Sequence, residues 1–110
     1  MKGVGIRKEL AATLGTHGVH DNGFRECTNA SYTGLFGMNA PAIRSALNIE
    51  KKDSIRDNLD KTQLLALSLS ESLANDDIKG RNLWGVEQCS QSCHDAAHTI
   101  YGAVMKFKQR

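Results

Sequence analysis

The sequence predicts an all-α protein, a compact bundle of four to six helices with a long C-terminal helix. Apolar residues recur at spacings of three and four along several segments, as they do on one face of a helix. Helix-start residues and glycines stand at the ends of these segments. No segment shows the alternation of apolar and polar residues that marks a half-buried strand. The 110 residues suit one domain, residues 1–110.

The first predicted helix spans residues 4–14. Ile6, Leu10 and Leu14 are four residues apart and form one apolar stripe. Residues 15–30 contain three glycines and many small polar side chains. This composition predicts a loop after the first helix.

The middle of the chain carries dense helix-boundary signals. A short helical turn is predicted over residues 31–36, ended by Gly37. Asn39 is a good N-cap for the next helix, because Pro41 then falls in the first turn, where its missing N–H costs nothing. This short helix is expected to end at Asn48.

Two more helices are predicted before the last one. The first begins near Asp53, an N-cap candidate, since Ile55 and Leu59 lie one turn apart. The second covers residues 61–79 and is rich in leucine near its start: Leu64, Leu65, Leu67, Leu69 and Leu73. Because these leucines occupy most sides of the helix, that part is expected to be central in the bundle.

The last predicted helix covers residues 85–107. Five apolar or small residues in it are spaced by four, three, four and three: Cys93, Ala97, Ile100, Val104 and Phe107. This spacing is typical of a helix seam that packs in a bundle or against a partner. We predict a homodimer formed through this helix.

Composition and charge bear on the binding partners and the cellular compartment of the protein. The net charge is +2 at pH 7, too small by itself to indicate nucleic-acid binding. Three cysteines, two of them four residues apart, make a poor disulfide framework, and reduced thiols fit the cytoplasm. No apolar run approaches the roughly 18 residues of a membrane helix. We predict a cytoplasmic protein that does not associate with a membrane.

Four side chains in the last helix resemble a set of metal ligands: Cys89, Cys93, His94 and His98. The two cysteines are one turn apart, as are the two histidines, but the two pairs point about 100° away from each other. All four cannot reach one ion, and structural zinc takes its ligands from separate elements. We predict no metal and no cofactor, and keep a metal- or thiol-based sensor as an alternative.

No residue pattern predicts catalysis. Cys27 lies in a polar segment near two histidines, but no oxyanion loop or orienting partner accompanies it. The acids Asp53, Asp57 and Asp60 are explained by helix capping. The glycines of the segment Gly34–Gly37 fit no phosphate-binding motif. The sequence therefore predicts that the protein is not an enzyme.

Two sets of residues are candidates for binding. The predicted partner-binding set is aromatic and aliphatic: Phe36, Trp84, Ile100 and Val104. The alternative is a small nucleic-acid-binding regulator that contacts phosphates through basic residues: Arg7, Lys8, Arg44 and Arg56. The expected partners are a second copy of the chain and an unidentified protein, with nucleic acid as the alternative.

The order of motifs resembles a bacterial and phage family. A TN-x-x-Y-x-GLFGM segment is followed by KKDSIRDNL and then by the leucine-rich helix. This order is similar to the region that follows the Bro-type DNA-binding domain in DNA-damage-inducible protein D and related phage antirepressors. The similarity covers about residues 28–104. The matching positions are Gly34–Met38, Lys52–Asp57, Leu64–Leu73 and Cys93-His94-Asp95.

The resemblance implies an accessory role. The family's last helix opens on a pair of histidines, and here Cys93 stands in place of the first of them. A chain of this length is not expected to contain the DNA-binding domain as well. The resemblance supplies no catalytic residues. The predicted function is a non-enzymatic protein-interaction and oligomerisation module of a phage, mobile-element or DNA-damage-response regulatory system.

Overall fold

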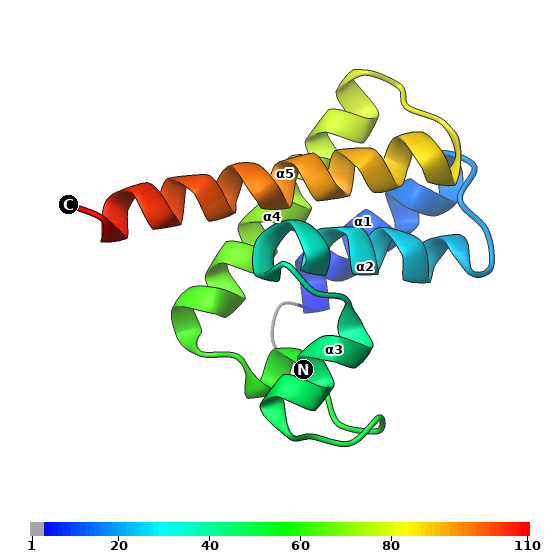
Figure 1. The fold of residues 1–110 in the computed structure, drawn as a ribbon. Coiled ribbons are helices and arrows are strands. Elements are labelled where there is room, and N and C mark those ends of the chain that lie inside the picture. The colour runs from blue at the N-terminus through cyan, green and yellow to red at the C-terminus, as the bar shows by residue number, and fades with distance from the viewer. Residues whose placement is uncertain (1–3) are drawn as a thin grey trace.

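The computed structural model describes residues 4–110, and all regular structure in this range is helical. The elements in chain order are α1 (Val4–Thr16), α2 (Gly23–Phe36), α3 (Ala40–Leu47), the 3₁₀-helix η1 (Arg56–Asn58), α4 (Lys61–Gly80) and α5 (Gly85–Lys108). Figure 1 shows α2 running alongside α5, while α3 and its loops lie apart from α5. The predicted all-α bundle with a long C-terminal helix is confirmed.

Several helix ends lie where the sequence places them, because local side-chain chemistry sets them. Gly37 follows α2 in the left-handed conformation with φ 74°. The Asn39 side chain accepts a hydrogen bond of 3.2 Å from the Ala42 N–H at the start of α3. Asp60 and Gln63 form a capping box, in which each side chain accepts a hydrogen bond from the other residue's backbone N–H.

Two predictions about the helices are wrong. The second half of the predicted loop at residues 15–30 belongs to α2, which begins at Gly23. Its small polar residues are weak helix formers, and burial of one face against the bundle supplies the missing stability. The helix predicted from Asp53 is only the 3₁₀ turn η1, because the Asp53 carboxylate accepts a hydrogen bond of 2.8 Å from the Glu50 N–H and closes a turn.

The buried residues form two groups along α2 and α5. One group joins α1, α2, α4 and α5: Leu10, Leu14, Val19, Cys27, Ala74, Ile78, Cys89 and Cys93. The other joins the middle segment to α2, α4 and α5: Tyr32, Leu35, Ile43, Ile55, Leu59, Leu67 and Ala97. Since α2, α4 and α5 contribute to both groups, these three helices form the centre of the bundle, where α2 runs alongside α5 (Figure 1).

The leucines of α4 do not all face the core. Leu67 and Ala74 are fully buried, whereas Leu65, Leu69 and Leu73 are 59%, 51% and 40% exposed. These three residues are spaced by four and therefore lie in one line on the outer face of α4. The expectation that the start of this helix is central is wrong for them, because the bundle covers only one side of α4. We call Leu65, Leu69 and Leu73 the leucine row.

A buried ion pair joins η1 to α4. The Arg56 guanidinium donates two hydrogen bonds to the Glu71 carboxylate, at 2.9 and 2.5 Å. Arg56 is 1% exposed and Glu71 is 4% exposed. Such a pair offsets the cost of removing both charges from water only while both partners are present.

A second carboxylate joins α4 to α5 nearer the surface. Asp77 accepts hydrogen bonds of 2.7 Å from the Arg81 guanidinium and one of 2.6 Å from the Ser92 hydroxyl. The hydrogen bonds from Arg81 and Ser92 lower the pKa of Asp77 below its ordinary value of 3.8.

This lowered pKa predicts acid sensitivity. The unfolded chain takes up a proton at Asp77 at a higher pH than the folded protein, so stability is lost as the pH falls below 3.8. We expect Asp77→Asn to be less stable than wild type at neutral pH and to lose less stability on acidification. Urea unfolding at several pH values checks this, with Glu9→Gln, at an exposed position on α1, as the control. Parallel pH profiles for wild type and Asp77→Asn would contradict the prediction.

Candidate functional site

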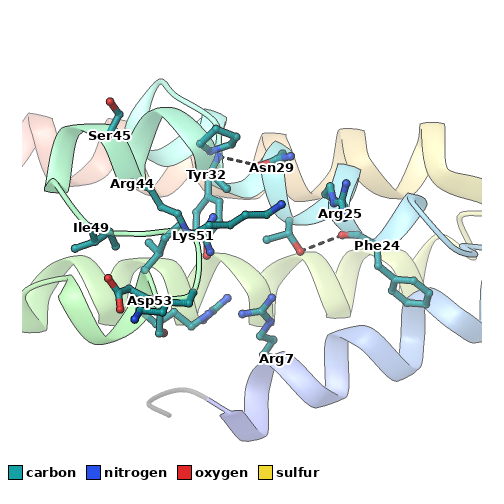
Figure 2. Close-up of a pocket in the computed structure, with 17 residues that line it drawn as sticks. Arg7, Phe24, Arg25, Asn29, Tyr32, Arg44, Ser45, Ile49, Lys51 and Asp53 are labelled. Atoms are coloured by element: carbon teal, nitrogen blue, oxygen red, sulfur yellow. Dashed lines mark hydrogen bonds between the residues drawn. The ribbon is translucent and has the colours of Figure 1, made fainter.

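A broad hollow lies between α1, α2, α3 and the segment that leads to η1. It has a volume of about 1070 Å³. Six of its lining residues are basic and one is acidic, Asp53. The basic residues are Arg7, Arg25, Arg44, Lys51, Lys52 and Arg56. We call this site the cationic hollow, and Figure 2 shows its side chains.

Local hydrogen bonds hold the walls of the hollow in place. The Asn29 side chain of α2 accepts a hydrogen bond of 2.9 Å from the Ala40 N–H and so fixes the start of α3. Asn48 has a left-handed conformation, with φ 56°, that turns the chain after α3. The turn closed by Asp53 then carries Lys51 back toward α2. In Figure 2 the Lys51 side chain reaches across the hollow.

Not all of the positive charge in the hollow is balanced within the protein. Glu71 neutralises Arg56, and Glu50 lies 3.3 Å from the Lys52 ammonium. Within residues 4–110, no carboxylate forms an ion pair with the other four cations: Arg7, Arg25, Arg44 and Lys51. Asp53 is engaged with the Glu50 N–H. The hollow therefore presents a surplus of positive charge.

One of these cations is partly desolvated as well. Arg44 is half-buried, and its Nε atom is buried with no hydrogen-bond partner in the described structure. An arginine fork with unused donors in a concave surface favours a planar or tetrahedral oxyanion as its partner. The arrangement can therefore bind anions.

The structure brings together most of the basic residues that the sequence analysis selected. Arg7, Arg44 and Arg56 all line the hollow, although they are far apart in the sequence. Lys8 is exposed and lies outside the lining. Sequence reasoning missed Arg25, Lys51 and Lys52 as site residues. The two adjacent lysines in the KKDS segment could have indicated a basic site. Arg25 could not be selected in the same way, because its segment was predicted to be a loop.

The four predicted partner-binding residues do not lie in one patch. Phe36 is half-buried and packs beside the core, with its ring centroid 6.3 Å from that of Tyr32. Trp84 is 64% exposed and stands just before α5, whereas Val104 lies near its end. About 20 helical residues separate these two positions, or roughly 30 Å. Ile100 and Val104 are half-buried on α5.

Trp84 has a local packing role in addition to its exposure. A Cβ added at Gly18 would lie 2.5 Å from the indole ring, so the ring rests directly against this glycine. Gly18 also has φ +84°, a conformation that favours glycine. The Gly85 N–H, next in the chain, donates a hydrogen bond of 2.8 Å to the His17 carbonyl. Trp84 therefore closes the junction of the α1–α2 loop with α5.

The candidate metal ligands fall into two separate environments. Cys89 and Cys93 are buried free thiols, while His98 is exposed and stacks on the partly exposed His94 with ring centroids 5.9 Å apart. The described residues contain no group of three or more histidine, cysteine or acidic side chains that could hold a metal. Burial raises the pKa of Cys89, which keeps this thiol neutral.

The described helices include none long and apolar enough to span a lipid bilayer. None of the curated proteins compared with this chain matches it. A family model does match. The model of the DinD C-terminal domain covers residues 4–109.

The chain belongs to the DinD C-terminal domain family. The resemblance inferred from the GLFGM segment and the leucine-rich helix is thereby confirmed, and it extends over nearly the whole chain. Membership indicates a DNA-damage-inducible or phage-type regulatory context for this DinD-type domain.

Proposed function

We propose that this DinD-type domain is a non-enzymatic protein-interaction and oligomerisation module that acts in the cytoplasm. The observation that carries the proposal is the leucine row on the outer face of α4. Leucines at three successive i, i+4 positions form a ridge of the kind that packs into the groove of another helix. Three partly exposed leucines in one line are unusual for a helix face that only meets water.

The partner that best fits the row is a second copy of the chain. In an antiparallel pair centred on Leu69, Leu65 of one copy lies opposite Leu73 of the other. The exposed residues Lys61 and Asp76 stand at opposite ends of the row. The same pairing brings each lysine toward the aspartate of the other copy. A two-fold pair therefore matches both the apolar row and the charges at its ends.

We expect Leu65→Gln/Leu69→Gln to weaken self-association. Burying the exposed half of each leucine contributes about 1 kcal/mol, and the double variant changes four side chains in a dimer. The dimer dissociation constant should rise more than about a hundredfold. Sedimentation equilibrium over a concentration series measures this change.

Leu47→Gln is the matched control, since Leu47 is also partly exposed but lies on α3. It should associate as the wild type does. A wild-type protein that stays monomeric would refute self-association by any surface. Loss of the dimer in Ile100→Gln/Val104→Gln, with no effect of the leucine-row variant, would place the interface on α5 instead.

A further inference from the structure

We infer that the cationic hollow is a binding site for a ligand with several linked phosphates, either a nucleotide or a short stretch of single-stranded nucleic acid. This inference does not depend on the leucine row. It rests on the four cations that no carboxylate in residues 4–110 balances, and on the shape of the surface that holds them.

The hollow gathers positive charge from several parts of the fold. Arg7, Arg25, Arg44 and Lys51 belong to α1, α2, α3 and the loop after α3, so the fold brings like charges together from four segments. Their mutual repulsion is unfavourable for folding, and a bound polyanion relieves it. A concave surface also concentrates the positive field and attracts anions from solution.

The hollow also contains buried hydrogen-bond donors that have no partner within residues 4–110. The Nε atoms of both Arg44 and Arg56 are buried without a hydrogen-bond partner in the described structure. Leaving a buried donor unsatisfied is costly, and a bound ion or water is one way to satisfy it. Glu71 takes both terminal nitrogens of Arg56, so the free fork for an incoming anion is that of Arg44.

Size and lining select the ligand. A volume of about 1070 Å³ is just above the usual range for small-molecule sites and far exceeds one phosphate ion. The lining also offers apolar surface from Phe24, Pro41 and Ile49. A nucleotide unit combines phosphates for the cations with an apolar base for this surface. A peptide made of acidic residues alone would use the charge but leave the apolar part of the lining without a matching group.

The test is a binding titration with a fluorescently labelled single strand of 12 thymidines at low salt. We expect binding that weakens steeply with salt. Unlabelled nucleoside triphosphate competes in a second arm. Displacement of the strand by the triphosphate at comparable phosphate concentration would assign the hollow to free nucleotides. Poor displacement would assign it to a nucleic-acid chain. Both results support a phosphate site.

Arg25→Gln/Lys51→Gln is the informative variant, since both side chains are exposed and the fold should be kept, as circular dichroism can verify. We expect it to bind the strand at least about tenfold more weakly, with a salt slope shallower by about 1.4. Lys106→Gln/Lys108→Gln removes the same charge from the end of α5 and should change affinity less than about twofold.

Three results would overturn the inference. The first is no binding of either the strand or the triphosphate by wild type at low salt. The second is an equal loss in the two double variants, which would assign binding to net charge rather than to the hollow. The third is displacement of the labelled strand by poly-glutamate as effectively, charge for charge, as by the unlabelled strand. That result would mean that the hollow selects negative charge alone.

Discussion

Replacing Glu71 with glutamine is expected to lower the free energy of unfolding by about 3 kcal/mol, because it leaves the Arg56 charge buried without a counter-charge. Arg56 is 1% exposed, so water cannot take the place of the carboxylate. Glutamine has nearly the same shape as glutamate, so the loss reports the charge and not a cavity. In a domain of about this size, a loss of about 3 kcal/mol corresponds to a fall in melting temperature of roughly 15 °C. The loss is large, because typical domains are stable by only about 5–15 kcal/mol in total.

Two further variants separate the buried charge from other causes. Arg56→Met/Glu71→Leu removes both charges and should be more stable than Glu71→Gln, since no ion is then buried alone. Glu50→Gln breaks the exposed Lys52–Glu50 pair and should change stability by less than about 1 kcal/mol. Chemical denaturation gives all three values. If Glu71→Gln were as stable as Glu50→Gln, the pair would have to be open to solvent.

Substituting alanine for Gly34 is expected to be the second most damaging change. Gly34 lies in α2 against α5, and an added Cβ would lie 2.5 Å from the His94 carbonyl oxygen and 2.9 Å from the Ala97 Cβ. The first of these atoms belongs to the α5 backbone, so α2 and α5 would have to move apart. Overpacking of this kind costs about 1–3 kcal/mol, and occasionally more, which outweighs the gain of about 1 kcal/mol from alanine's higher helix propensity.

Gly102→Ala is the matched control for this prediction. Gly102 is also a helical glycine, in α5, but an added Cβ there would meet nothing within 4 Å. It should raise stability by up to about 1 kcal/mol through helix propensity alone. Thermal unfolding of the two variants should therefore move in opposite directions from wild type. A stabilised Gly34→Ala protein would show that α2 and α5 are free to separate.

The candidate site could be predicted only in part from the sequence. Arg7, Arg44 and Arg56 were selected as a basic set, but no local pattern shows that they share one surface. That convergence depends on α3, which the Asn29 side chain holds against α2. Arg25 was missed for a related reason, since its segment has few strong helix formers and its helix depends on burial against α5. Patterns within single segments therefore identified some of the basic residues but could not predict that these residues line one hollow.

The sequence by itself determined the helical class and many of the helix ends, including those at Gly37, Asn39 and Asp60. These features depend on side chains within one turn of each other, so nearby residues suffice to specify them. Only the tertiary structure decided that residues 23–30 are helical, that the leucine row faces outward and that four unbalanced cations meet in one hollow. Each of these depends on contacts between segments far apart in the chain, where burial outweighs local propensity.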